Sequence, residues 1–165
     1  MYRDRNSVAS LIMEWLVMRL LLVLAVVTIT FISSSSALAM TQSIELHSTQ
    51  GYKVETIFSY DEQLVSAPIK EQGFGKTKVI DSMEVSFYNP AGKLLATYKN
   101  VINGIAQGNY FEFNFDPTTQ RLLGNIDLGG EFRGEMYLKG SVEKGLALIE
   151  VEATGEEKAI DWVNQ

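Results

Sequence analysis

The sequence contains no cysteine, and this absence removes several kinds of site at once. Structural disulfides, thiolate nucleophiles and zinc or iron–sulfur centres held by cysteine all require a thiol. His47 is the single histidine, so a site built from several histidines is excluded as well. No strand-turn-helix elbow of a Ser-His-Asp hydrolase is present. We therefore expect no metal and no cofactor, and a fold that is stabilised by packing alone.

Positive charge is also scarce. The chain has 14 basic and 20 acidic residues, which gives a net charge of −6. Affinity for nucleic acid comes largely from basic side chains that neutralise phosphates, and no basic cluster is present here. Nucleic acid and anionic membrane surfaces are therefore not expected as partners of this acidic protein.

Long apolar runs are limited to one stretch near the N-terminus. Residues Leu20 to Ile32 form an uncharged run of 13 residues. This length is typical of the apolar region of a signal peptide and is short of the ~20 residues that cross a bilayer. Arg19 precedes the run, and Ala37 and Ala39 place small residues at the two positions that signal peptidase requires.

We therefore expect residues 1–39 to be a helical signal peptide that is cleaved after Ala39, with Met18 as an alternative start. Residues 40–165 then form a single domain that is secreted or periplasmic, with no stable membrane span after cleavage. The alternative is an uncleaved anchor, which Glu14 and Arg19 disfavour because they interrupt the apolar stretch.

After residue 43 the dominant hydrophobic period is two. Apolar side chains alternate with polar ones in residues 51–60, 83–88 and 110–116, and the last of these segments places Phe111, Phe113 and Phe115 on one face. Such alternation is typical of half-buried antiparallel strands, and no helical stripe is evident. The sequence therefore predicts an all-β domain.

Turn signals separate these strands. Asn89–Gly92 and Asp116–Thr119 each combine a proline with residues that favour tight turns. Residues 61–75 are expected to be one long connection. The result is an antiparallel β-sandwich or barrel of eight or nine strands, which cover about residues 43–48, 51–60, 76–88, 93–101, 109–115, 121–128, 134–139, 146–153 and 157–163.

Acidic side chains supply the only candidates for acid–base chemistry or cation binding. Glu112 with Asp127, or Glu150 with Glu152, could act as a carboxylate pair of the kind found in glycoside hydrolases. Asp116, Asp127 and Glu131 could offer oxygens to calcium, although their spacing matches no calcium loop. Solvated faces of strands explain the same carboxylates without any chemistry.

Aromatic side chains give the positive indication of binding. Tyr88 and Tyr110 fall on polar strand faces, and Glu112 lies close to Tyr110 in sequence. A tyrosine presents a rigid apolar ring with a polar tip, which suits contacts with sugars or with another protein. We take Tyr88, Tyr110 and Glu112 as candidates for a binding surface. The alternative is that strands simply favour aromatic residues.

The segment from Phe58 to Leu138 resembles a group of exported β-rich proteins, found mainly in cyanobacteria, many of which carry the PEP-CTERM sorting signal. The resemblance lies in strand-and-turn pattern, namely Phe58-Ser59-Tyr60-Asp61, Met83 to Asn100, Tyr110 to Gly124, and Tyr137-Leu138. It implies export and a β fold but no particular activity. The sequence ends at Gln165 without a Pro-Glu-Pro motif, so the resemblance implies release or periplasmic retention without sorting to the surface.

Three functions follow from these observations. The first is a non-enzymatic exported domain with a structural or binding role, whose partner is a polysaccharide or another exported protein. The second is a β-barrel carrier that holds an apolar ligand in a cavity lined by Val85 and the three phenylalanines 111, 113 and 115. The third is a carboxylate-dependent hydrolase, which requires two carboxylates to converge in a cleft.

Overall fold

The computed structural model describes residues 39–65 and 68–164. These residues belong to one compact unit, Ala37–Gln165. The expected signal peptide, its helix and Ala37 lie outside the described residues, while Ala39 is the first residue of strand β1. Within the described part of the chain, no helix is long and apolar enough to cross a membrane.

The prediction of an all-β antiparallel domain is confirmed, but the expected number of eight or nine strands is wrong. The described residues form thirteen strands and one short 3-10 turn, with bounds β1 Ala39–Ser48, β2 Lys53–Asp61, η1 Glu62–Leu64, β3 Ile69–Gln72, β4 Gly75–Lys76, β5 Ile80–Tyr88, β6 Leu94–Ile102, β7 Ile105–Ala106, β8 Glu112–Asp116, β9 Arg121–Leu122, β10 Asn125–Gly129, β11 Met136–Ser141, β12 Gly145–Val151 and β13 Glu157–Asn164. The long strands agree with the predicted ranges to within a few residues.

The additional strands arise mainly where a long connection was expected. Within 61–75 the chain forms η1 and then β3, which pairs with β8 from Ile69↔Phe115 to Gln72↔Glu112. β3 carries no apolar alternation because its second buried residue is Glu71, whose carboxylate accepts hydrogen bonds from the backbone of Lys78 and Val79. Strands β4, β7 and β9 have two residues each, too few to show any period.

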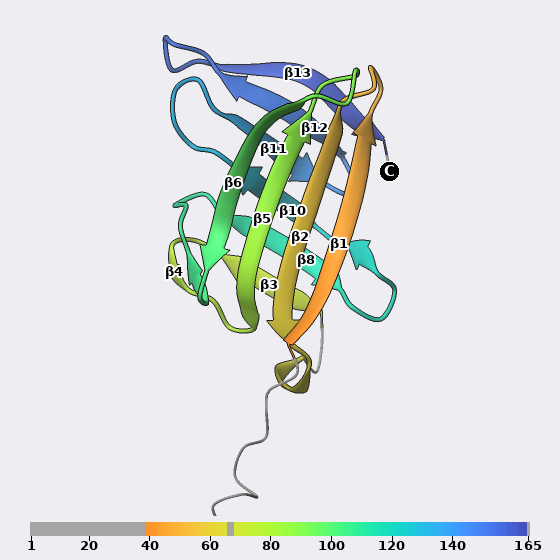
Figure 1. Ribbon diagram of the computed structural model, residues 1–165, viewed down its shortest axis with the longest axis vertical. Coiled ribbons are helices and arrows are strands. Elements are labelled where there is room, and N and C mark those ends of the chain that lie inside the picture. The colour runs from red at the N-terminus through yellow and green to blue at the C-terminus, as the bar shows by residue number, and fades with distance from the viewer. Residues whose placement is uncertain (1–38, 66–67, 165) are drawn as a thin grey trace, which may run out of the picture. The chain divides into compact units, whose positions relative to one another are not determined.

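All thirteen strands belong to one antiparallel sheet that curls into a half-barrel (Figure 1). The strand order is β3-β8-β10-β11-β12-β13-β1-β2-β5-β6-β7-β4, and β9 pairs with β8. One wall contains β1, β2, β5 and β6, and the other contains β8 and β10–β13. The walls join through β13 and β1, which share the register His47↔Asn164 and Ser48↔Val163.

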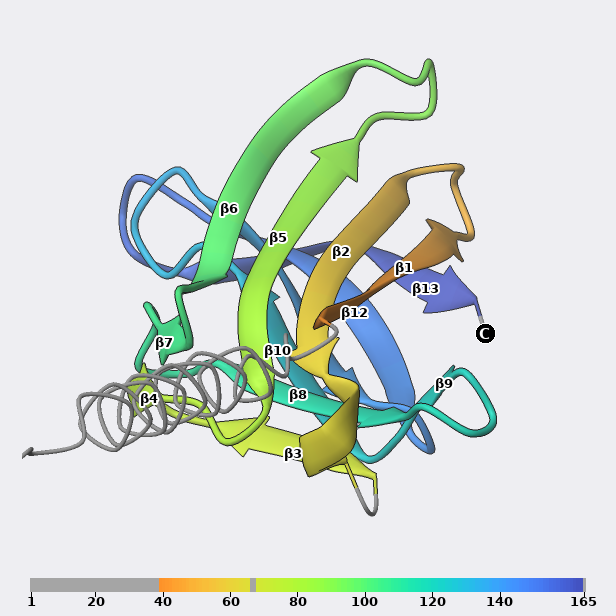
Figure 2. The ribbon, with the colours of Figure 1, turned by 60° about the horizontal axis from the view of Figure 1, so that its bottom comes forward.

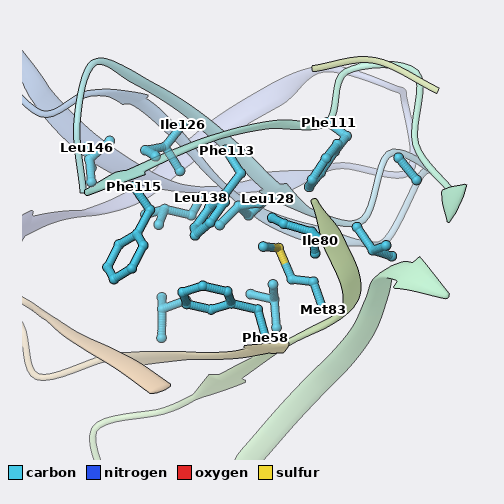
Figure 3. Packing of buried hydrophobic residues seen from close by; sticks show 14 of the residues in the cluster. Phe58, Ile80, Met83, Phe111, Phe113, Phe115, Ile126, Leu128, Leu138 and Leu146 are labelled. Carbon is cyan, nitrogen blue, oxygen red and sulfur yellow. The ribbon is translucent and has the colours of Figure 1, made fainter. Parts of the chain in front are cut away.

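The core lies between the two walls, and aromatic rings from both sides meet in it (Figure 3). The ring of Phe58 on β2 lies with its centroid 4.9 Å from that of Phe113 and 5.1 Å from that of Phe115, both on β8. Phe111 and Val85 are equally buried. The side chains that a carrier would use to line a cavity therefore all belong to the buried core cluster.

At the edge of the first wall, β6 runs close to the second wall (Figure 2), and a side-chain amide links the two. The amide of Asn100 on β6 donates to the carbonyl of Gly129 at 2.8 Å and accepts from the amide of Gly129 at 2.9 Å. The hydroxyl of Tyr98 accepts a hydrogen bond from the backbone of Met136 at 3.0 Å. β6 and β10 do not pair as strands, so these hydrogen bonds link the two walls at this point and stabilise the curled sheet. Asn100 is buried, and its polar atoms therefore need such partners.

Candidate functional site

Functional side chains gather on the face of the β8–β13 wall that points away from the core, called here the outer face. On β10, Ile126 and Leu128 face the core, so that Asp127 between them points outward. On β11, Leu138 faces the core, while Tyr137 and Lys139 on either side of it point outward. The period of two thus places Asp127, Tyr137 and Lys139 on the outer face.

Outer-face residues of β12 and β13, most of them small, form the floor of this face. Gly145, Ala147 and Ile149 alternate with the core residues of β12, and Ala159 on β13 pairs with Ile149. The side chain of Trp162 lies beside this floor. Its ring is so close to Gly145 that a Cβ atom at that position would be in van der Waals contact with it. Short side chains flanked by larger ones leave hollows on this surface of the sheet.

Two adjoining hollows result. The acidic hollow has a volume of about 330 Å³ and is defined by Tyr110, Asp127, Glu131, Tyr137, Lys139 and Glu157. The tryptophan hollow has a volume of about 540 Å³ and is defined by Glu112, Asp127, Lys139, Ala147, Ile149 and Trp162. Both volumes fall in the range of small-molecule binding sites. The hollows share Asp127 and Lys139, so they meet at this pair of side chains.

Asp127 is the carboxylate with the most unusual environment in the acidic hollow. Its side chain is 17% exposed, and its nearest cation is the Lys139 ammonium, 3.8 Å from its Oδ2 atom. It accepts no hydrogen bond from the side chains described. Burial raises the pKa of Asp127 to about 6, Lys139 opposes that rise, and the carboxylates of Glu131, Glu157 and Glu112 add to it.

Tyr137 brings a second unsatisfied group to the same hollow. The residue is only 4% exposed, and its hydroxyl has no hydrogen-bond partner among the described residues. Burial raises the pKa of Tyr137, and the neighbouring carboxylates of Glu157 and Asp127 raise it further. A buried hydroxyl without a partner costs free energy, so a water molecule or a ligand that hydrogen-bonds to Tyr137 would be favourable here.

Lys139 lies between two carboxylates without pairing closely with either. Its Nζ atom is 3.8 Å from Asp127 Oδ2 and 3.8 Å from Glu157 Oε1. Charge-assisted hydrogen bonds between an ammonium and a carboxylate are about 2.7–2.9 Å long. Both carboxylates therefore keep most of their capacity to accept hydrogen bonds from a ligand, while the ammonium keeps its capacity to donate.

Tyr110 forms the rim of the acidic hollow. Its backbone amide donates to Glu131 Oε1 at 2.7 Å, which fixes the loop, while its side chain is 68% exposed. Glu131 is held in turn because its own amide donates to Glu135 Oε2 at 2.8 Å. An exposed ring on an anchored backbone is a suitable platform for the apolar face of a ligand.

The structure separates the three predicted binding residues. Tyr110 lines the acidic hollow and Glu112 lines the tryptophan hollow, where Glu112 is also the cross-strand partner of Asp127. Tyr88 lies on β5 of the other wall, where its hydroxyl donates to Glu55 at 3.1 Å and its ring contacts the Lys53 ammonium. Tyr88 lines neither hollow.

Sequence reasoning missed Tyr137, Lys139, Glu157 and Trp162 as site residues. The missing signal was available in part, because the alternation over 136–141 already places 137 and 139 on the face opposite Leu138. What the sequence does not reveal is that β13 lies beside β12 in a register that brings Glu157 next to Val151.

Other candidates occupy ordinary structural positions. Asp116 accepts hydrogen bonds from Thr118 and Thr119 in the turn after β8, four residues along that strand from Glu112. Glu150 is exposed, and Glu152 contacts Lys158 at 3.7 Å. Within residues 39–65 and 68–164, no group of three or more histidine, cysteine, aspartate or glutamate side chains is arranged to hold a metal ion.

No known protein family, curated protein or solved structure matches this chain.

Proposed function

We propose that the protein is an exported, non-enzymatic β domain that binds a neutral polysaccharide through the acidic hollow. Export rests on the apolar run and the small residues of the expected leader, and on the resemblance to exported β-rich proteins. The binding role rests on one observation above all: the buried hydroxyl of Tyr137, for which the described residues supply no hydrogen-bond partner, lies in one hollow with the largely buried carboxylate of Asp127.

A sugar hydroxyl satisfies both groups at once. It accepts a hydrogen bond from the Tyr137 hydroxyl and donates one to a carboxylate oxygen, whereas an anionic group has no donor for the carboxylate. The exposed ring of Tyr110 at the rim offers a surface for the apolar face of a sugar ring. The carboxylates of Asp127, Glu131 and Glu157 disfavour polymers of uronic acids by repulsion.

Binding to an array of neutral, uronate and amino-sugar oligosaccharides tests the proposal, with the protein purified after expression of the full chain. We expect neutral oligosaccharides to bind and uronates not to bind. Tyr110→Ala should weaken binding about tenfold. Phe132→Ala is the matched control, because Phe132 is 73% exposed on a nearby loop and does not line the hollow. Binding of uronates alone, or equal losses in both variants, would contradict the proposal.

A second candidate function is a carboxylate-dependent glycoside hydrolase, which the raised pKa of Asp127 favours. With a pKa of about 6, Asp127 keeps a proton in mildly acidic solution and can give it to a glycosidic oxygen. Glu112, its cross-strand partner, would activate the attacking water. Release of reducing ends from a bound neutral oligosaccharide, abolished by Asp127→Asn, would support hydrolysis. Binding without any release would leave the binding domain as the function.

A further inference from the structure

We propose that the acidic and tryptophan hollows form one continuous groove that binds an extended stretch of a polysaccharide chain, with Trp162 as a second stacking platform. This inference rests on the proposed binding function and specifies the form of the ligand: several consecutive sugar units within a chain, in place of a single sugar or a chain end.

The two hollows have common side chains and a common floor. Asp127 and Lys139 line both of them. The outer-face residues of β12 continue from Gly145, Ala147 and Ile149 in the tryptophan hollow to Val151 in the acidic hollow. At about 3.3 Å per residue, this floor extends for about 20 Å along β12. A groove of that length is open to a chain that lies along the strand.

An aromatic side chain lies at each end of the groove. Tyr110 lines it at the acidic end and Trp162 lines it at the other end, and these side chains are 68% and 57% exposed. Trp162 is held in place because it follows Asp161, whose buried carboxylate accepts hydrogen bonds from the backbone of Gln50 and of Trp162 itself. Its ring lies beside Gly145, where a Cβ atom would be in van der Waals contact with it.

Polar groups lie between these two platforms. The Lys139 ammonium and the Asp127 carboxylate stand where the hollows meet, and Glu112 lies on the tryptophan side of them. A donor and several acceptors placed between two separated rings suit a chain that carries hydroxyl groups along its length.

The experiment measures the affinity of the full-chain protein for a ladder of one neutral oligosaccharide of two, four and six units, chosen from those that bind on the array. We expect the affinity to rise about tenfold or more from the shortest to the longest ligand. Trp162→Ala should remove this gain while it leaves the affinity for the two-unit ligand within about twofold. Phe74→Ala is the control, because Phe74 is 68% exposed and lines neither hollow.

Equal affinity for all three lengths, or an equal loss at every length in Trp162→Ala, would overturn the continuous groove and leave the binding function intact. If ligands of no length bind, the proposed function itself fails. Far-UV circular dichroism of the variant, compared with the unaltered protein, separates a loss of the groove from a loss of the fold.

Discussion

Replacing Asp127 by asparagine should make the protein more stable at neutral pH. The pKa of Asp127 is raised from 3.8 to about 6 in the folded state. Between these two values the unfolded chain has lost the proton that the folded protein retains, so stability falls as pH rises through this window. A shift of this size corresponds to about 3 kcal/mol, at 1.36 kcal/mol for each pKa unit. An asparagine carries no charge and avoids this cost.

Urea unfolding at a series of pH values, followed by far-UV circular dichroism, measures the effect. The two proteins should have similar stability near pH 4, where Asp127 is protonated, and the variant should exceed the unaltered protein by about 3 kcal/mol above pH 7. Glu150→Gln removes an exposed carboxylate from the same wall and should change little. A variant that is less stable than the parent at pH 7, or a difference that does not change with pH, would refute the reasoning.

Three further predictions concern the fold. Phe58→Ala should lower the free energy of unfolding by about 3–5 kcal/mol, because it opens a cavity among rings from both walls; thermal unfolding measures the loss. Asn100→Ala should cost about 2 kcal/mol and speed amide exchange at Gly129, because both backbone groups of that residue lose their partner. Asp161→Asn should lower the free energy of unfolding at pH 7, because hydrogen bonds that include one from Thr49 hold the pKa of Asp161 below its usual range despite burial. That difference should shrink as the pH falls below about 4, because the unfolded chain then takes up a proton that the folded carboxylate still resists, and urea unfolding at pH 7 and at about pH 3 would show whether it does.

The long strands could be predicted from the sequence because each buries one face. In β2, in β8 and in β5 from Met83 onward, every second side chain is buried, and this pattern is visible in the order of residues alone. The same is true of the turn after β5, where the Asn89 side chain accepts from the amides of Ala91 and Lys93. The local sequence is therefore enough to predict these elements.

The curl of the sheet could not be predicted in this way. It depends on pairs that are distant in the chain, such as β13 with β1, and on a side chain that replaces a strand pair, as Asn100 does with Gly129. Asparagine and glutamate are polar, so a sequence pattern predicts that Asn100 and Glu71 are exposed. Both are buried, and the reason becomes evident only when their hydrogen-bond partners are known. The candidate site shares this difficulty, because its residues come from separate strands whose order the pattern leaves open.

The acidic hollow lowers the stability of the domain that carries it. The ionised Asp127 and the unpaired hydroxyl of Tyr137 are both unfavourable for folding, and a leucine or a phenylalanine at either position would remove the penalty. Most surface carboxylates of this protein avoid such a cost because they are exposed or capped by backbone amides, as Asp116 is. Two groups that destabilise the fold and face the same hollow are expected where a ligand forms hydrogen bonds with both, since binding then recovers the free energy that was lost on folding. The Asp127→Asn and Tyr137→Phe variants should therefore be more stable than the parent and bind the neutral oligosaccharide more weakly, and a Tyr137→Phe protein with full affinity would show that the hydroxyl has no part in binding.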